Sequence, residues 1–319
     1  MIDGLAAVLR PALGEDVRVE NLRTLTGGAS RITSAFDAVT GATRRKLILR
    51  AAPIAEGQFA GMELEAAVQA AAAEAGAPVP HILVASNSAA ALGNPFLICD
   101  EIAGETIVRK IQRALDDAGR ARLLTQCGQA LAAIHRARID APDLVERDEV
   151  GEWRQRLDDL DDTTATFEWA FRWLAANRPA PGPRTLVHGD FRMGNLIVDG
   201  STLAAVLDWE AVHIGDVHED LAWFCVRAWR FGAPATLAAG GLGSIEEFVS
   251  AYEQAGGVTV DRDALRWWQV LGTLKWGIIC RYQAERHLSG QTRSVELAAI
   301  GRRVCETEWD ILTLLEAAS

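Results

Sequence analysis

The chain is poor in cysteine, short of positive charge and without a long apolar run. Five cysteines are scattered over 319 residues with no Cys-x-x-Cys pair, which argues against a disulfide framework or a zinc site and favours buried free thiols. A net charge of −11 argues against a nucleic-acid partner, because such proteins carry a clustered basic face. No apolar run reaches the roughly 18 residues of a membrane span, and the N-terminus lacks the features of a secretion signal. We therefore expect a soluble protein of the reducing cytoplasm, without a membrane partner.

Tryptophan is absent from the first 150 residues, and all ten tryptophans follow them. This asymmetry predicts two differently built regions, and an apolar content of 49% is enough to give each a core. The first region alternates strand-like and helix-like segments, and Gly104 marks the passage to a mostly helical second region. Strands are expected at 17–25, 32–39, 46–50 and 96–99, and helices at 62–75, 121–138, 244–255 and 264–287.

One segment carries a pattern of oxygen-bearing side chains with a defined spacing. Residues 188–195 read His-Gly-Asp-Phe-Arg-Met-Gly-Asn, and Asp208 follows thirteen positions after Asn195. Between them, 196–198 and 203–207 are predicted strands joined by a tight turn. Such a hairpin returns Asp208 to the side of Asn195, where one metal ion could contact both.

This spacing suits magnesium-dependent phosphoryl transfer. The reaction needs one carboxylate to orient the attacking hydroxyl and two further oxygen ligands to hold Mg²⁺ on the triphosphate. We assign the first role to Asp190 and the metal to Asn195 and Asp208, as in the Asp-x-x-x-x-Asn pattern of kinases. Asp199 and Gly200 are interpreted as an ordinary solvated turn.

At these residues the chain resembles the aminoglycoside phosphotransferase family of kinase-like enzymes, in particular the branch related to kinase-like domains associated with acyl-CoA dehydrogenases. The segments that carry the resemblance are 186–197, 206–210, 215–216 and 220–223. The resemblance implies an α+β, bilobal, protein-kinase-like fold with a small β-rich N-lobe (1–102) and a larger, mainly helical C-lobe (103–319). It also implies ATP, with GTP possible, and Mg²⁺ as cofactors. The implied acceptor is a small-molecule hydroxyl of an aminoglycoside-like compound, a hydroxyacyl compound, a sugar or an amino alcohol.

A glycine turn is the first candidate for the nucleotide site. Gly27 and Gly28 stand between two predicted strands, where backbone amides could approach phosphates closely. The same turn is equally compatible with a simple hairpin. The resemblance implies that Ser30 and Arg31 lie over the phosphates.

A cation on the third strand is the second candidate. Arg50 stands where most kinases have lysine, and its planar guanidinium can still grip a phosphate or a glutamate; a surface arginine at a strand end is the alternative. Its expected partner is Glu65, with Glu63 as the competitor. Segment 96–102 resembles the kinase hinge, so the backbone from Asp100 to Ile102 is expected to bind the adenine edge.

Four further residues are expected to support the site. His188 is expected to brace the catalytic loop rather than move protons, since the adjacent carboxylate already accepts the hydroxyl proton. Arg192 could contact the γ-phosphate or an anionic substrate, or pair with an acidic residue of its own lobe. Asp216 and Asp220 match a family segment that supports the loop from behind.

Several alternatives remain open at this point. His213, His218 and Asp216 could form a metal site, but sequence shows no tight convergence. The tryptophans are core residues by default, and some could line the acceptor pocket. A protein kinase is disfavoured because helix is expected soon after Asp208, where an activation loop would be. A nucleotide-binding pseudokinase without turnover is the main functional alternative, and an unrelated hydrolase or binding protein is the second.

Overall fold

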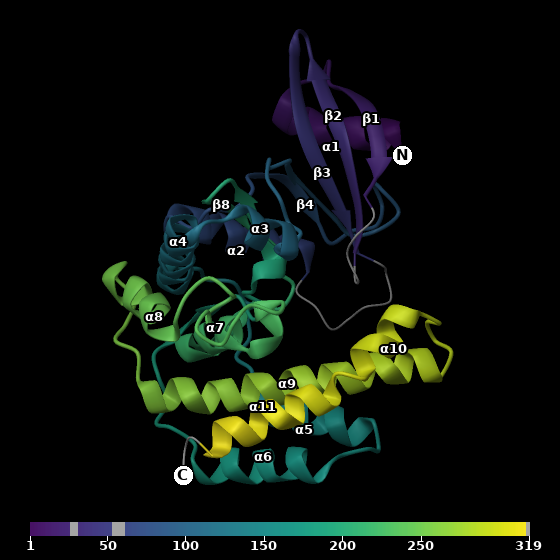
Figure 1. Cartoon of the computed structure of the whole chain (residues 1–319). Coiled ribbons are helices and arrows are strands. Elements are labelled where there is room, and N and C mark those ends of the chain that lie inside the picture. The colour runs from purple at the N-terminus through teal and green to yellow at the C-terminus, as the bar shows by residue number, and fades with distance from the viewer. Residues whose placement is uncertain (26–30, 53–60, 317–319) are drawn as a thin grey trace.

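The computed structural model describes residues 1–25, 31–52 and 61–316, which form two lobes of different size. The small lobe is built on an antiparallel five-stranded sheet with the strand order β1-β2-β3-β5-β4, which projects away from the helical lobe in Figure 1. Its elements are α1 (Ile2–Leu13), β1 (Arg18–Thr24), β2 (Ile32–Thr40), β3 (Thr43–Ala51), α2 (Met62–Glu74), β4 (Ile82–Ser86) and β5 (Phe96–Asp100).

The sheet is covered on both faces, because alternate side chains of β5 lie in two different buried clusters. Phe96 and Ile98 face a core cluster that contains Leu5 and Leu9 of α1. Successive strand residues point to opposite faces. Leu97 and Cys99 accordingly lie in a second cluster with Met62 of α2. The side chains of β3 that point to the α2 face are therefore held between the sheet and that helix.

The large lobe is mostly helical, with two short hairpin-like sheets. Helix α9, 27 residues long, runs through it and contacts α5, α6, α7, α10 and α11 (Figure 1). The helices are α3 (Val108–Ala114), α4 (Asp117–Arg136), α5 (Glu149–Asp159), α6 (Ala165–Ala176), α7 (Val217–Cys225), α8 (Ile245–Gln254), α9 (Arg262–Leu288), α10 (Val295–Gly301) and α11 (Val304–Glu316). The remaining elements are β6 (Arg184–Val187), η1 (Met193–Asn195), β7 (Leu196–Asp199), β8 (Thr202–Val206), β9 (His213–Asp216) and η2 (Arg227–Arg230).

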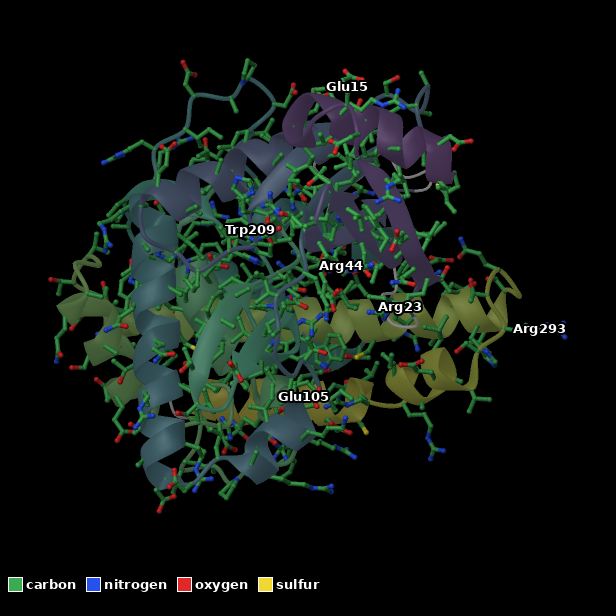
Figure 2. All side chains as sticks on the ribbon, turned by 90° about the horizontal axis from the view of Figure 1, so that it is seen from above. Glu15, Arg23, Arg44, Glu105, Trp209 and Arg293 are labelled. Carbon is green, nitrogen blue, oxygen red and sulfur yellow. The ribbon has the colours of Figure 1, made fainter. Side chains whose placement is uncertain are left out.

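The main core of the large lobe reaches into the small one. Trp209 is fully buried in it and lies near the middle of the molecule in Figure 2, whereas Glu15 and Arg293 project at the rim. Val68 and Ala72 of α2 belong to the same buried cluster. Helix α2 therefore touches the sheet at its first turn and is anchored in the large core along its second half.

The expected fold class and the expected strands and helices are confirmed, with shifts of a few residues at their ends. Helix α1 and strand β4 of the small lobe were not predicted, and in the large lobe the same holds for α3, α5, α6, α10, α11, β6 and β9. The prediction of helix soon after Asp208 needs a correction, because strand β9 comes first and α7 begins only at Val217. Four of the five cysteines are buried and free, and Cys305 is exposed.

The division expected between residues 102 and 103 falls between β5 and α3 and stays a prediction. Among the residues that the structure describes, no helix combines the length and apolar character that crossing a membrane requires.

Candidate active site

The hairpin formed by β7 and β8 brings the predicted metal ligands to the catalytic loop. Its strands pair from Leu196 opposite Val206, and the Leu207 amide donates to the Asn195 carbonyl at 2.8 Å. Asp208 follows directly, in the left-handed region with φ 69°. Because a non-glycine residue takes this conformation only when its surroundings hold it there, the orientation of Asp208 is imposed by the fold.

The carboxylate of Asp190 is held by three neighbours. The Asn195 side-chain amide donates to its Oδ2 at 2.7 Å, and Trp223 Nε1 donates to its Oδ1 at 2.7 Å. Arg192 Nε lies 3.0 Å from Oδ1 and 3.1 Å from Oδ2, and the Arg192 guanidinium stacks over Trp229. Arg192 thus pairs with an acidic residue of its own lobe, which was the alternative to contact with a phosphate or an anionic substrate.

Backbone conformation fixes the start of the loop. Gly189 has φ +80°, and a Cβ at this position would lie 2.6 Å from the Ala211 carbonyl oxygen. Both His188 and Gly189 donate their amides to the carboxylate of Asp220, at 2.8 and 2.9 Å. Burial alone would raise the pKa of Asp220, but the hydrogen bonds from His135 and His188 hold it below its ordinary value. Asp220 is therefore ionised, and its carboxylate fixes the backbone of His188 and Gly189.

The ring of His188 is occupied at both nitrogens. Nδ1 accepts from the Asp190 amide at 3.2 Å, which leaves Nε2 to donate to the Leu207 carbonyl at 3.1 Å. Burial lowers the pKa of His188, consistent with a neutral ring. The ring thus connects the Asp190 backbone to Leu207, the residue before Asp208, and holds the two segments together.

Asp216 lies apart from the catalytic loop. It caps helix α7 by accepting from the His218 amide, binds His218 Nδ1 at 2.6 Å and accepts from the Gly182 amide at 3.1 Å. Its contribution is to fix the helix that carries Asp220 and Trp223.

Arg50 connects the small lobe to the metal-binding candidate. It extends from β3 on the α2 side and donates to Glu65 at 3.3 Å and to Asp208 at 2.8 Å. Burial alone would lower the pKa of Arg50, but these two carboxylates raise it. Glu63 is not the partner, because it exchanges hydrogen bonds with Asn87.

Glu65 is completely buried and shared by two arginines. Besides Arg50, it accepts a hydrogen bond from Arg31, whose Nε lies 3.2 Å from Glu210 in the large lobe. Burial raises the pKa of Glu65 to about 7, although both arginines oppose the shift. The Arg31 side chain thus crosses to the large lobe. Gly27, Gly28 and Ser30 lie outside the described residues.

Two backbone amides of the predicted hinge already have partners within the protein. The amides of Asp100 and Glu101 donate to the carbonyls of His81 and Lys46 at 3.0 Å each, and the Asp100 side chain pairs with Arg45. Neither amide is available to a nucleobase. In the described part of the chain no hydrogen bond engages the Ile102 backbone, and binding of the adenine edge by the backbone of Asp100 to Ile102 stays a prediction.

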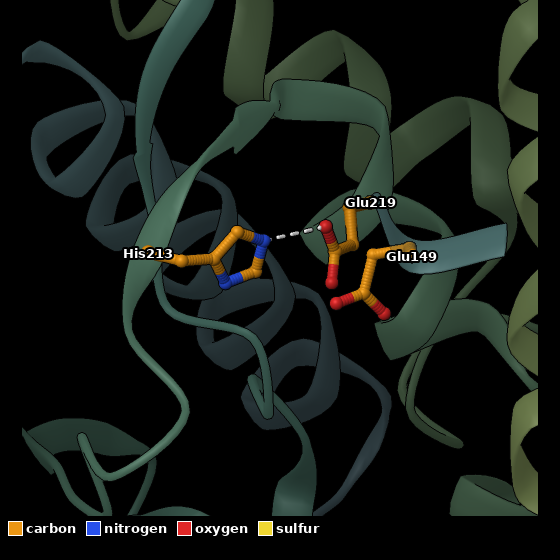
Figure 3. A group of neighbouring side chains, drawn as sticks. All are labelled: Glu149, His213 and Glu219. Atoms are coloured by element: carbon orange, nitrogen blue, oxygen red, sulfur yellow. Dashed lines mark hydrogen bonds and ion pairs between the residues drawn. The ribbon is translucent and has the colours of Figure 1, made fainter. Parts of the chain in front are cut away.

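A second polar cluster lies buried beneath the catalytic loop (Figure 3). Glu149, His213 and Glu219 each present one ligand atom within 4.8 Å of the others. Lys275 Nζ lies 3.3 Å from Glu149 Oε2 and 3.5 Å from Glu219 Oε1. An ammonium thus lies between the two carboxylates of this group, and the alternative considered from the sequence, a metal site of His213 with His218 and Asp216, does not form.

The charges of this cluster balance without a metal. Burial would lower the pKa of Lys275, but Glu149 and Glu219 raise it. Burial would likewise raise the pKa of Glu149, yet Lys275 and His213 lower it to about 2. Lys275 also contacts the Gly189 carbonyl at 3.5 Å and lies 5.0 Å from the ring centroid of Trp223, so the cluster supports the residues that hold Asp190.

Trp223, Lys275 and Glu149 were not singled out from the sequence as site residues. A signal existed for Lys275, which interrupts the apolar stripe of α9 between Leu274 and Ile278. A charge on a buried helical face needs a partner, but the sequence does not say which one.

Comparison with known proteins identifies the family. The model of the phosphotransferase enzyme family matches residues 22–268, so the chain belongs to this family of small-molecule kinases. Mouse acyl-CoA dehydrogenase family member 10 is 26% identical over 84% of the chain, and human member 11 is 24% identical over 73%. The chain spans 27% and 32% of the length of these two relatives.

Solved structures share the fold. A candidate aminoglycoside phosphotransferase from Ralstonia eutropha superimposes with a TM-score of 0.77 and 20% identity, covering 97% of each chain. A choline/ethanolamine kinase family protein from Mesorhizobium loti gives a TM-score of 0.64 at 20% identity, covering 99% of this chain and 95% of that one.

Proposed function

We propose that the chain transfers the γ-phosphoryl group of ATP to a hydroxyl of a small molecule in a Mg²⁺-dependent reaction. The observation that carries the proposal is the convergence of Asp190, Asn195 and Asp208. Asn195 hydrogen-bonds Asp190 at 2.7 Å, and its carbonyl binds the residue before Asp208 at 2.8 Å. This supports the order of roles that phosphoryl transfer needs.

The residues fit a magnesium ion. Asn195 uses its amide nitrogen on Asp190, which leaves its side-chain oxygen for a cation. Asp208 offers a carboxylate beside it, and Mg²⁺ takes hard oxygen ligands of this kind together with phosphate oxygens. Asn195 and Asp208 would hold the ion, and the chemistry it supplies there is neutralisation of charge on the phosphates.

The chain's own groups orient and activate the acceptor. Asp190, fixed by Trp223 and Arg192, positions the hydroxyl and accepts its proton. Arg50 exchanges Asp208 for phosphate oxygens when the nucleotide binds, while Glu65 keeps it in place. Ile102 offers its backbone to the base, and Gly27, Gly28 and Ser30 cover the phosphates.

Known relatives support a nucleotide and a small acceptor. The aminoglycoside phosphotransferase APH(4)-Ia, with a TM-score of 0.60 and 18% identity, is described in a ternary complex with ADP and hygromycin B. GTP in place of ATP stays open, as does the acceptor among aminoglycoside-like, hydroxyacyl, sugar and amino-alcohol classes. The family match removes the unrelated hydrolase or binding protein, and the pseudokinase remains the alternative.

Substitution of the base candidate tests the proposal. We expect Asp190→Asn to reduce turnover by about 10³-fold, because the amide cannot accept the proton, and to change the affinity for Mg·ATP by less than about threefold. The assay follows ATP consumption and the mass shift of the acceptor across the four acceptor classes. Asp199→Asn, an exposed carboxylate in the hairpin turn, is the matched control.

Two results would contradict the proposal. One is turnover in Asp190→Asn equal to that of the wild type. The other is nucleotide binding without phosphorylation of any acceptor class, which would support the pseudokinase.

A further inference from the structure

A pocket rich in arginine opens in the large lobe beside helix α7. Its volume is about 530 Å³, within the range of small-molecule sites. We call it the arginine pocket, and its defining residues are Arg109, Arg227, Arg230, Trp276 and Arg303.

The positive charge of this pocket is only partly balanced. Arg227 pairs with Asp310 at 2.6 Å and Arg303 with Glu306 at 3.1 Å. Within the described ranges, no salt bridge engages Arg230, and its burial lowers its pKa. A half-buried guanidinium without a carboxylate partner is costly unless an anion completes it.

An adjoining pocket continues the same surface. It has a volume of about 380 Å³, shares Arg109 and adds Arg113 and Arg120. Because the whole chain carries a net charge of −11, this gathering of arginines is opposite in sign to the rest of the protein and would attract an anion.

Hydrogen-bond donors without acceptors gather at the same place. Arg230 Nε, Trp276 Nε1 and Trp229 Nε1 are buried and have no hydrogen-bond partner. All three are groups that only donate. Arg230 and Trp276 line the pocket and Trp229 packs against Trp276, so the wall of the pocket holds more donors than the acceptors of the protein satisfy.

The pocket is linked to the catalytic loop by stacked indole rings. The ring of Trp276 lies 4.8 Å from that of Trp229, which lies 5.1 Å from that of Trp223. Trp223 in turn donates to Asp190 at 2.7 Å. Trp223 and Trp229 are buried, so these ring contacts place the pocket near Asp190, within a span that one small-molecule acceptor can cover.

We propose that the arginine pocket binds an anionic group, a phosphate or a carboxylate, at the far end of the hydroxyl acceptor. The inference rests on the proposed function and names the acceptor's chemical class. The ATP phosphates are not the anion in question, because none of the pocket residues is among the nucleotide-binding candidates. Charge-assisted bidentate contacts from arginine provide the selectivity for such a group.

A direct binding experiment tests the pocket without turnover. Inorganic phosphate or acetate is titrated into the full chain with Mg·AMP-PNP present, and tryptophan fluorescence reports on Trp229 and Trp276. We expect saturable binding that Arg230→Gln weakens about tenfold or more. Trp276→Phe, which removes one donor and keeps a ring, should weaken it less. Arg154→Gln is the matched control, because Arg154 is also half-buried with an unpaired Nε but lies on α5 and pairs with Glu168 and Asp158.

A turnover experiment tests the acceptor class. Hydroxyalkyl compounds of equal chain length that end in a phosphate, a carboxylate, a hydroxyl or an amine are compared by kcat/KM. We expect an anionic member to exceed the neutral one by about tenfold or more. We also expect Arg230→Gln to remove that preference by raising the KM of the anionic acceptor. The phosphate and carboxylate arms distinguish the two sources of the anion.

The outcomes separate the two proposals. Equal use of anionic and neutral acceptors, or phosphate and acetate binding that is absent or indifferent to Arg230→Gln, would overturn the arginine pocket and leave the kinase assignment intact. Phosphate binding that depends on Arg230, together with no turnover of any acceptor by the wild type, would instead contradict the proposed function.

Discussion

At the scale of single residues, Asp190 is positioned by side chains that come from distant parts of the chain. Trp223 on α7 and Asn195 in η1 hold its two oxygens. Lys275 on α9 lies behind Trp223 and joins it to the buried pair Glu149 and Glu219. The buried ammonium is therefore both a charge partner and a packing support for the ring that orients the base.

Lys275→Met is expected to destabilise the chain by about 3–5 kcal/mol, because it removes the cation that Glu149 and Glu219 share and leaves only His213 beside Glu219. Adding Glu149→Gln should recover part of that loss, since it removes one of the unpaired charges. Urea unfolding of the two single variants and the double variant measures the coupling as a double-mutant cycle. Strictly additive losses would show that Lys275 and Glu149 do not act as a pair.

At the scale of elements, the passage between the lobes depends on one glycine. Gly104 has φ +145°, and a Cβ there would lie 2.5 Å from Ile197 Cγ2 and 2.9 Å from the Val198 oxygen. The next residue, Glu105, exchanges backbone hydrogen bonds with Val198 at 2.8 and 3.0 Å. The connecting segment therefore packs directly on strand β7, one strand of the hairpin that joins Asn195 to Asp208.

Gly104→Ala is expected to cost about 2–4 kcal/mol of unfolding free energy, from backbone strain together with the clash against β7. Gly200→Ala is the matched control, because Gly200 has φ +60° on the same hairpin but nothing within 4 Å of a Cβ. The control should lose only about 1–2 kcal/mol. Chemical denaturation compares the two, and equal losses would mean that close packing at Gly104 has no part in the effect.

Local pattern predicted the elements with strong periodicity, and its failures have physical causes. Strands β2, β3 and β5 and the long helix α9 were found because alternation or helical spacing was strong. Helix α1 has Leu5, Ala6 and Leu9 at helical spacing but contains Pro11, a residue that usually ends helices, and it was not predicted. Strand β4 carries half-buried residues throughout and gives no alternation.

Only the residues of the sequence motif could be predicted as neighbours. Asn195 and Asp208 stand at the two ends of one short hairpin, and Asp190 precedes it by a few residues, so the sequence alone indicates that the three lie close together. The roles of Trp223 and Lys275 were not, because they depend on how α7 and α9 pack against the loop. That packing is set by tertiary contacts and not by residue spacing.

At the scale of the whole molecule, the lobes are joined by ion pairs. Arg31 and Arg50 come from the small lobe, and Asp208 and Glu210 from the large one. Glu65 lies between the arginines on helix α2, whose second half is anchored in the large core. Helix α2 packs against strands β4 and β5 of the sheet as well as against the large core, so Glu65 and its two arginines lie at the junction of the two lobes.

Glu210→Gln is expected to loosen the sheet without unfolding the large lobe. Arg31 keeps Glu65 but loses its charged link to the other lobe, an interaction of about 1.5–3 kcal/mol. Hydrogen exchange should therefore quicken in residues 31–51 and stay unchanged in 262–288, and Mg·ADP should restore protection in 31–51. Glu101→Gln is the control, because Glu101 pairs with Arg23 at 3.7 Å within the small lobe. This ion pair is half-exposed to solvent. Faster exchange in both segments would indicate general destabilisation, and no change in 31–51 would mean that the Arg31–Glu210 pair does not hold the lobes together.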